Sequence, residues 1–527
     1  MDMFIFVLLF LILFFFILFF ILGNVGFSFS ILGLDLLDLS FHVDWVSVVF
    51  GFLLFLIVGC ILLYSCYYMS FDLMFSYYVV VLMVFVFSMV GVVFSDNCLS
   101  MIISWDVLGV SSYFLVLYYG NWDSCPGSLN TVMLNRLGDV CVFLVFSGLF
   151  IFGESFVFVM VLGVSSLIFF FFGCMTKSAQ IPFSSWLPKA MSAPTPVSAL
   201  VHSSTLVTAG LFLAFCFSDV IFLDFFMVLL FFVGLLTMFI SGFSACFECD
   251  LKKMVALSTL SQIGFCFFGL GLGLVFFSFI HILSHAIFKS CLFMQVGYLI
   301  HSFGGQQDGR GYSYVSSGFG LVWVQIYVCL MCLCGVFFLS GAVSKEMLLE
   351  FYFFSSWGFG VFLFFGFSVV FTFFYCYRIL GSFFGSFFFS MFYVGVSWFF
   401  SFCSVVLVIM SVFFIWWLVM NFMVVPLSFL YFDFFSFFCF VLIFLCFSVL
   451  CFFIFGFDDI KYKFFFDFLP KSFLCLNLNN RYLDSVLMKL VLDSYSGFFY
   501  FSSNFYSYFG GKGLNFVVVL FFLFLLL

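Results

Sequence analysis

Apolar stretches of about 20 residues recur along the chain and are separated by short polar segments. A helix of that length crosses the ~30 Å hydrocarbon core of a bilayer, where only helices and closed barrels satisfy their backbone hydrogen bonds. The alternation of apolar and polar positions that a membrane barrel needs is missing. The pattern therefore predicts an all-α bundle of about fifteen membrane-spanning helices. They lie near 3–22, 45–68, 74–95, 98–119, 130–152, 156–181, 197–217, 221–243, 250–274, 275–301, 319–349, 354–380, 391–421, 432–457 and 511–527.

One long polar segment, 458–510, interrupts this series near the C-terminus. Within it, residues 481–493 place apolar side chains at helical spacing, with Asp484, Lys489 and Asp493 between them. This pattern is typical of an amphipathic helix that lies along a membrane surface. An ordinary polar loop is the alternative.

Composition agrees with a membrane protein. Hydrophobic residues make up 67% of the 527 residues and charged residues only 7%, against about 25% in a soluble domain. This excludes a soluble domain, a disordered chain, collagen and a coiled coil, and the net charge of −8 offers no basic surface to nucleic acid. The 104 phenylalanines are typical of a T- and G-rich gene. We therefore expect organellar encoding, and no signal or transit peptide is visible.

The twenty cysteines stand mostly alone inside apolar runs. In such runs cysteine behaves as a small buried hydrophobe. Cys332 and Cys334 form a CxC pattern, but no second cluster of ligands accompanies it. We therefore expect inert packing thiols, without metal or disulfide.

Basic residues indicate the orientation of the spans. If successive loops alternate sides, Lys and Arg collect on one side, whereas the opposite loops carry acidic residues and essentially no basic ones. The N-terminus is therefore expected on the inner, basic side.

A set of ionisable residues remains inside the predicted spans, where each costs about 2.5–3.5 kcal/mol on insertion scales. Arg136 and Asp139 are three residues apart and share one helical face. The residues His281, His285 and Lys289 recur every four positions and form a stripe. The full set is Asp106, Arg136, Asp139, Lys177, His202, His281, His285, Lys289, Lys345 and Glu346.

Simpler explanations exist for single members of this set. A lone buried His202 is as easily a packing residue with a hydrogen bond, and Arg136 with Asp139 is as easily a structural ion pair. A metal at His281 and His285 lacks further ligands. A whole series of acids and bases on successive spans is best explained by sites that exchange protons.

Lys177 and Lys345 occupy similar positions. Each follows an apolar span and a hydroxyl residue, near a helix-breaking Gly or Pro. Broken helices in corresponding positions of two halves point to a transport site.

Several motifs resemble those of the antiporter-like subunits of respiratory complex I. Residues 186–191 read Trp-Leu-Pro-Lys-Ala-Met, and 193–202 read Ala-Pro-Thr-Pro-Val-Ser-Ala-Leu-Val-His. The segments 203–210, 250–253, 258–264 and 307–310 agree with the family, as do the stripe at 281–289, Phe41-His-Val-Asp-Trp at 41–45, Asn-Arg-Leu-Gly-Asp at 135–139 and Ser-Lys-Glu at 344–346. The resemblance covers about residues 41–380, and the C-terminal part of the chain matches only in its general arrangement.

The resemblance implies two inverted repeats with broken helices. The expected parts are N-terminal helices in 1–95, a proton-translocating core in 96–380 with repeats at about 98–217 and 250–380, and C-terminal helices in 381–457. A lateral amphipathic helix in 458–510 and a final anchor in 511–527 follow.

The resemblance also implies roles for site residues. Asp106 corresponds to the carboxylate that the family pairs with a lysine, here Lys177, so that Lys177 exchanges a proton as Asp106 approaches or withdraws. Asp139 is implied as a second carboxylate near this pair. Lys345, with Glu346 beside it, is implied as the terminal site toward the outer exit.

Between these ends, the resemblance implies a relay. Its members are His202, Lys252, His281 and His285, with Lys289 on the same stripe, and water is expected to connect them.

Three features depart from the family pattern. Asp106 stands where the family has Glu, so its carboxylate reaches one methylene less far. Lys189 stands where an acidic residue is common. One span precedes Phe41 where two are usual, and loss of the first helix is expected because the loop charges also start the chain inside.

The implied function is that of a core subunit of complex I in the inner mitochondrial membrane. Proton translocation would be coupled to NADH-to-ubiquinone electron transfer, as part of NADH:ubiquinone reductase. No redox centre is expected in this chain, since FMN, iron–sulfur clusters, NADH and ubiquinone belong to other subunits.

The expected partners are neighbouring antiporter-like subunits, contacted through the lateral helix, and membrane lipids including cardiolipin, with no nucleic acid. The alternative is the large subunit of a multi-subunit Na⁺/H⁺ antiporter, which usually has a longer C-terminal region. A structural scaffold with degenerate motifs is a third hypothesis, disfavoured by the intact series of acids and bases.

Overall fold

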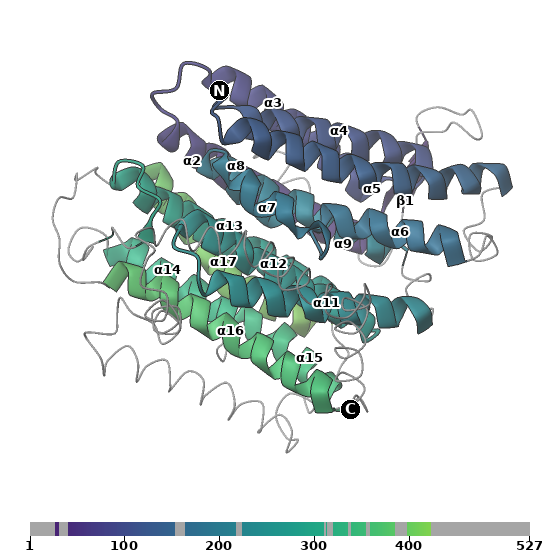
Figure 1. Cartoon of the computed structure of the whole chain (residues 1–527). Coiled ribbons are helices and arrows are strands. Elements are labelled where there is room, and N and C mark those ends of the chain that lie inside the picture. Colours follow the sequence, from purple (N-terminus) through teal and green to yellow (C-terminus); the bar gives the residue numbers. More distant parts are fainter. Residues whose placement is uncertain are drawn as a thin grey trace, which may run out of the picture.

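A computed structural model describes residues 27–30, 40–152, 164–217, 224–309, 312, 320–335, 339–354, 359–384 and 398–422. Its helices lie side by side in one bundle (Figure 1). The helices α3, α4 and α5 lie together along one edge, α15 and α16 lie along the opposite edge, and α12 and α13 lie between them.

The longer helices are α2 (Trp45–Tyr68), α3 (Phe75–Phe94), α4 (Cys98–Leu117), α5 (Ser124–Phe152), α6 (Val164–Lys177), α9 (Leu206–Cys216), α11 (Asp224–Ala245), α12 (Leu251–Gly271), α13 (Val275–Ser302), α14 (Gly320–Cys334), α15 (Ser340–Phe354), α16 (Phe359–Phe384) and α17 (Trp398–Phe422). Shorter pieces join α6 to α9. They are η3 (Phe183–Ser185), α7 (Trp186–Lys189), η4 (Ala190–Ser192), α8 (Thr195–Val197) and the π-helical η5 (Ser198–Thr205).

Nine helices among the described residues are long and apolar enough to cross a membrane by length and composition. The prediction of an all-helical membrane bundle is therefore confirmed. The predicted spans at 3–22, 432–457 and 511–527 and the lateral helix at 458–510 lie outside the described residues. The proposed domain boundaries stay predictions.

One predicted span is wrong. The stretch 319–349 is two helices, α14 and α15, because the chain turns at Gly335, whose φ of +77° suits glycine.

A two-stranded antiparallel ribbon was not predicted. The strands β1 (Phe27–Ser30) and β2 (Ser40–Val43) pair with each other. Alternating phenylalanine and serine in 27–30 is the period-2 pattern that suits a strand.

The centre of the bundle is buried and polar at the same time. Almost every residue of α12 and most residues of α13 are buried, although both helices carry ionisable side chains. By contrast, α3, α4 and α5 expose large apolar side chains such as Val84, Val107 and Leu137. An apolar outer face suits lipid or neighbouring subunits, so the ionisable residues of α12 and α13 lie where hydrocarbon does not reach.

Two of the sequence motifs meet at one end of the bundle. The backbone N–H of Leu251 donates to the Gln307 carbonyl at 3.0 Å, and Asp250 and Asp308 form an antiparallel bridge. The Arg378 guanidinium donates to the carbonyls of Cys246 and Phe247 beyond the end of α11. These contacts fix the start of α12 against residues 307–309.

Candidate functional site

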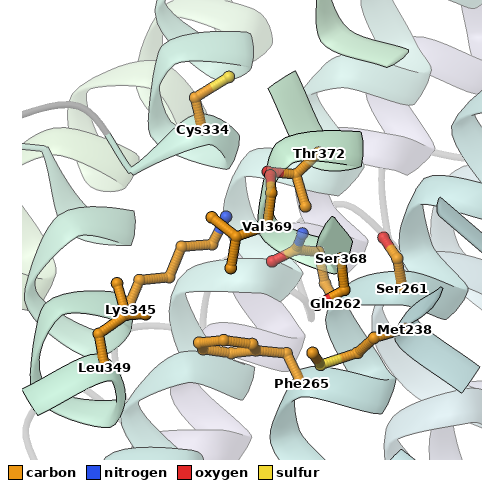
Figure 2. A pocket seen from close by; sticks show the side chains of 10 residues that line it. All are labelled: Met238, Ser261, Gln262, Phe265, Cys334, Lys345, Leu349, Ser368, Val369 and Thr372. Carbon is orange, nitrogen blue, oxygen red and sulfur yellow. The ribbon is translucent and has the colours of Figure 1, made fainter. Parts of the chain in front are cut away.

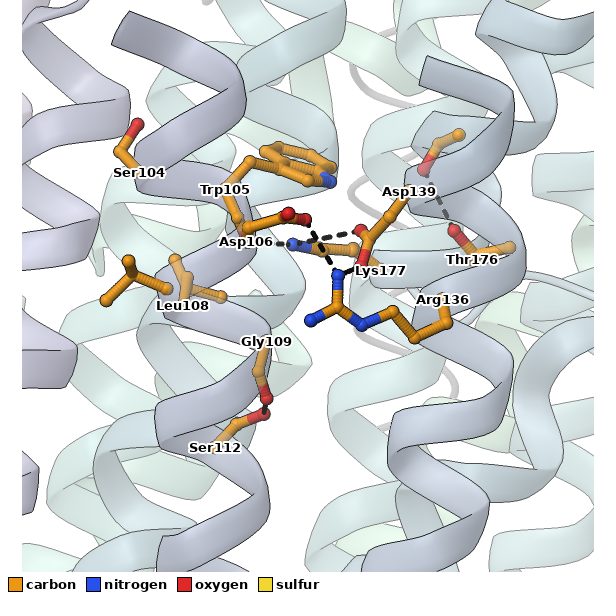
Figure 3. Close-up of polar contacts among 12 residues, drawn as sticks. Ser104, Trp105, Asp106, Leu108, Gly109, Ser112, Arg136, Asp139, Thr176 and Lys177 are labelled. Atoms are coloured by element: carbon orange, nitrogen blue, oxygen red, sulfur yellow. Dashed lines mark hydrogen bonds and ion pairs between the residues drawn. The ribbon is translucent and has the colours of Figure 1, made fainter. Parts of the chain in front are cut away.

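The first cluster of ionisable side chains joins α4, α5 and α6 (Figure 3). Lys177 Nζ lies 3.5 Å from Asp139 Oδ1. Arg136 Nη1 lies 3.0 Å from Asp106 Oδ1 and 3.6 Å from Asp139 Oδ2. The four groups therefore form a chain in which Asp139 is shared by Lys177 and Arg136.

This arrangement corrects the expected pair of Asp106 with Lys177. Asp106 is bound by Arg136, and Lys177 has Asp139 as its contacting carboxylate. The reason is the rotation of α4, which turns Trp105 toward Lys177 and leaves the Asp106 side chain 40% exposed. The Arg136–Asp139 pair that the sequence indicated is present, although it is one part of a larger cluster.

Trp105 holds the Lys177 ammonium from a second side. Lys177 Nζ donates to the Trp105 carbonyl oxygen at 2.8 Å and lies 4.0 Å from the centre of its ring. Lys177 is itself fully buried. Carbonyl and π-face contacts stabilise a cation that water cannot reach.

The end of α6 places Lys177 in a helical C-terminal turn. Ala179 adopts φ +57°, the Gln180 N–H donates to the Met175 carbonyl at 3.0 Å, and the Ala179 N–H donates to the Thr176 carbonyl at 3.3 Å. These two bonds are the pattern of a Schellman motif. The negative end of the helix dipole therefore lies next to the Lys177 charge.

A glycine allows α5 and α6 to approach closely at this cluster. A Cβ added at Gly138 would lie 2.8 Å from Thr176 Cβ and closer still to the Thr176 hydroxyl. Gly138 adjoins Asp139, and Thr176 adjoins Lys177. The ion pair of Lys177 and Asp139 therefore depends on the absence of a side chain at 138.

A cavity of about 190 Å³ adjoins the cluster between α4 and α5. Asn135, Arg136 and Asp139 supply its polar wall, and Tyr113 and Phe114 are among its apolar lining. The cavity opens on the outer face of α4 and α5, where its lining residues Val110 and Phe114 are exposed, and the buried Asp139 is part of its lining.

His202 lies in η5, the π-helical turn before α9. Its ring is buried, and neither ring nitrogen has a hydrogen-bond partner among the described residues. The Trp186 ring contacts it edge-on at 6.0 Å, and Trp186 Nε1 donates to the Thr176 carbonyl at 3.0 Å. Trp186, from the 186–191 motif, thus links the end of α6 to His202.

The α13 stripe connects the two halves of the bundle, because α13 packs against η5 and also against α14 and α15. His281 Nδ1 lies 2.8 Å from Ser344 Oγ, and Lys289 Nζ donates to Ser258 Oγ at 2.5 Å. The Nε2 atoms of His281 and His285 have no hydrogen-bond partner among the described residues. These imidazoles are free to accept or donate a proton.

Lys345 lies on α15 and reaches the end of α14, where its ammonium donates to the Leu333 carbonyl. It lines a small cavity of about 20 Å³, enough for a single water, together with Gln262 and Thr372 (Figure 2). Glu346 lies in α15, and its side chain is outside the described part of the structure.

Lys252 lies in the first turn of α12 and is buried. Its Nζ donates to the Ala193 carbonyl at 3.4 Å. This contact ties Lys252 to the 193–202 motif, whereas no hydrogen bond between described residues joins it to the α13 stripe.

Sequence reasoning missed the groups that hold the charges. Trp105, Ser258 and Ser344 were not proposed, although Trp105 adjoins Asp106 and Ser344 adjoins Lys345. A neutral residue next to an ionisable residue within a predicted span is therefore a candidate contact for a buried charge. Within the described residues, no three His, Cys, Asp or Glu side chains gather closely enough to hold a metal ion.

Comparison with known proteins identifies similar sequences. A family model described as "NADH:quinone oxidoreductase/Mrp antiporter, TM" matches residues 95–372. The chain is 45% identical to NADH-ubiquinone oxidoreductase chain 5 of Caenorhabditis elegans over 94% of this chain and 93% of the relative. It is also 45% identical to the protein of that name from Ascaris suum, over 95% of this chain and 92% of the relative.

Two solved structures share the fold. The Mrp complex from Dietzia sp. aligns with a TM-score of 0.70 and 20% identity, over 92% of this chain and 59% of that chain. The membrane-bound sulfane sulfur reductase, an archaeal respiratory membrane complex, aligns with a TM-score of 0.68 and 20% identity, over 76% of this chain and 70% of that chain.

Proposed function

The chain belongs to the family of NADH-ubiquinone oxidoreductase chain 5, and on this premise we propose which of its residues carry protons and how. As a core membrane subunit of respiratory complex I, it translocates protons in a process coupled to NADH-to-ubiquinone electron transfer. It therefore takes part in the NADH:ubiquinone reductase reaction, and other membrane-arm subunits are its partners.

The observation that carries the proposal is the buried pair of Lys177 and Asp139 at the end of α6. Lys177 holds a proton while the Asp139 charge is close. Arg136 competes for the same carboxylate at 3.6 Å. When Arg136 moves from Asp106 toward Asp139, Lys177 loses part of its compensation and releases its proton, because a buried unpaired ammonium is unfavourable.

The proton then moves through the centre of the bundle. His202 receives it from the Lys177 end, and His281 and His285 pass it along α13. Lys345 is the terminal site, with Glu346 beside it. Water in the cavities next to Asp139 and Lys345 supports the transfer.

Two further lysines assist this relay. Lys252 supplies a buried charge near the 193–202 motif. Lys289, bound to Ser258, extends the α13 stripe by one turn.

Energy for this movement comes from outside the chain. Moving one charge against 100 mV requires about 2.3 kcal/mol. We assign the FMN, the iron–sulfur clusters and the sites for NADH and ubiquinone to other subunits of the complex.

The chain is a multi-pass membrane protein. We place it in the inner mitochondrial membrane, encoded by the organellar genome. A lateral helix at 458–510 that binds neighbouring antiporter-like subunits, and bound cardiolipin, stay predictions because that segment lies outside the described residues.

A second candidate is the large subunit of a multi-subunit Na⁺/H⁺ antiporter, because the Mrp complex shares the fold. The two relatives that this chain matches over more than 90% of their length are both named NADH-ubiquinone oxidoreductase chain 5, and they favour the first function. Purification of the complex that contains this chain distinguishes the two functions. Subunits with flavin and iron–sulfur clusters are expected to copurify with a complex I subunit. An antiporter subunit would copurify without them, and its complex would transport Na⁺.

The test of the site replaces each central lysine. We expect Lys177→Met and Lys345→Met to abolish or sharply reduce NADH-driven proton pumping while the complex still assembles. Lys253→Met is the matched control, because Lys253 pairs with Asp250 at the end of the bundle and is 39% exposed. An unchanged ratio of protons to electrons in both central variants would refute the relay.

A further inference from the structure

Two buried cysteines adjoin Lys345 and have no part in the relay described above. Cys334 ends α14, and Cys376 lies in α16. Their thiols are buried and lie close enough to interact with each other. Cys334 lines the same small cavity as Lys345, and Figure 2 shows both side chains at that cavity.

Lys345 differs from Lys177 in its acidic partners. Lys177 contacts the carboxylate of Asp139, whereas no carboxylate among the described side chains forms an ion pair with Lys345. Among the described residues that line the cavity beside Lys345, Cys334 is the acidic group.

The backbone brings Lys345 to Cys334. The Lys345 ammonium donates to the carbonyl of Leu333, the residue before Cys334. A Cβ added at Gly335, the residue after it, would lie 3.0 Å from Lys345 Cδ. The lysine side chain therefore lies along the end of α14, close to the residue before Cys334 and to the residue after it.

We propose that Cys334 exchanges protons with Lys345 and that Cys376 is the residue that positions Cys334 and stabilises its charge. The proposal deepens the proton-translocating function proposed for Lys345 and rests on it. In the step, the S–H bond of Cys334 breaks and its proton passes to a water in the shared cavity, and that water gives a proton to the neutral amine of Lys345, where an N–H bond forms. The product is a thiolate beside an ammonium, and the reverse transfer restores the thiol.

The surroundings favour this charge pair. A thiolate is stabilised by a nearby cation and by a thiol that donates to it, and Lys345 and Cys376 supply these groups. The end of α14 stabilises the ammonium through its carbonyls. The same arrangement, a lysine at a helix C-terminal end with an acidic partner, holds Lys177 and Asp139.

Other titratable groups reach this site from α13. His281, His285 and Lys289 interact with Lys345 or with the cysteines. From α12, the cavity receives the uncharged Ser261 and Gln262. The α13 groups are bases. The acidic groups described around this cavity are the two thiols and the phenol of Tyr375, whose hydroxyl is hydrogen-bonded with Ser261 and Gln262.

A purely structural role makes a different prediction. If Lys345 only caps the carbonyls of α14, then removal of the Cys334 thiol leaves proton pumping and its pH dependence unchanged. The experiment therefore compares variants of Cys334 in the assembled complex, in membrane vesicles driven by NADH.

We expect Cys334→Ala to lower proton pumping by about a hundredfold, the lower end of the range for loss of a proton-transfer group. Cys334→Asp is expected to restore pumping, with the acidic limb of its pH profile at lower pH, because a carboxylic acid releases its proton more readily than a thiol. Cys376→Ser keeps a donor and is expected to preserve pumping, whereas Cys376→Ala weakens it. The S–H stretching band in infrared difference spectra between resting and energised complex should vanish in Cys334→Ser.

The matched control is a second buried thiol pair, Cys60 and Cys403. These thiols are also buried and lie close enough to interact, and no lysine among the described residues acts on them. Replacing both with alanine should leave pumping intact.

Three results separate the possible failures. If Lys345→Met abolishes pumping but Cys334→Ala keeps normal pumping and a normal pH profile, the relay stands and the thiol proposal is wrong. The proposal also fails if Glu346→Gln abolishes pumping while Cys334→Ala does not, because the acid is then Glu346. If Lys345→Met itself has no effect, the proposed function of the site fails and the thiol proposal fails with it.

Discussion

Replacing Asp139 with asparagine removes the carboxylate that contacts Lys177 and keeps the shape of the side chain. The Lys177 ammonium is then fully buried without a contacting anion. A pair of charges about 4 Å apart interacts by about 4 kcal/mol at an effective dielectric constant of 20. Removing one partner of a buried pair costs about 3–5 kcal/mol, so Lys177 is expected to lose its proton at rest.

The same change at Asp106 has a smaller expected effect. Asp106→Asn removes the 3.0 Å ion pair between Arg136 and Asp106. The 3.5 Å ion pair between Lys177 and Asp139 is retained. Arg136 then competes more strongly for Asp139, so pumping is weakened and not abolished. Since about 1.4 kcal/mol corresponds to a factor of ten, we expect Asp139→Asn to lose about a hundredfold more pumping than Asp106→Asn.

The assay is the quenching of a pH-sensitive dye in inside-out membrane vesicles supplied with NADH. Native gel electrophoresis measures how much complex has assembled, and pumping is expressed per assembled complex. Asp139→Glu is the control that keeps the charge. Equal losses in the two asparagine variants, or a larger loss in Asp106→Asn, would refute the assignment of Asp139 as the partner of Lys177.

Three further changes test the packing and the second half of the site. Gly138→Ala is expected to push α6 away from α5, because its Cβ would overlap with Thr176; reduced thermal stability of the complex, with lower pumping, would be measured, and unaltered values would contradict the close approach. Asp106→Glu should be tolerated, since the longer side chain still reaches Arg136, and a pumping rate near that of the parent checks it. Ser344→Ala removes the hydroxyl that lies 2.8 Å from His281 Nδ1; pumping is expected to fall by a few fold, with assembly unchanged, and Ser344→Thr, which keeps the hydroxyl, should not show this loss.

The sequence by itself determined which segments are helices and which residues are out of place in hydrocarbon. Apolar runs near 20 residues leave the backbone no alternative to a helix within lipid. Spacing along one helix also decides which side chains share a face, so the stripe of His281, His285 and Lys289 follows from the four-residue interval alone. A helix-breaking residue near Lys345 was expected, but the span 319–349 was still predicted as one helix, because a single glycine within an apolar run does not reveal its φ.

Only the tertiary structure decided which charges contact each other. The family resemblance implied Asp106 as the partner of Lys177 and Asp139 as a second carboxylate nearby, whereas the close approach of α5 and α6 at Gly138 selects Asp139. The meeting of Cys334 with Lys345 across the break between α14 and α15 likewise depends on how separate helices pack. Periodicity describes one helix at a time, whereas the partner of a buried charge depends on the rotation and depth of its neighbours, which side-chain packing sets.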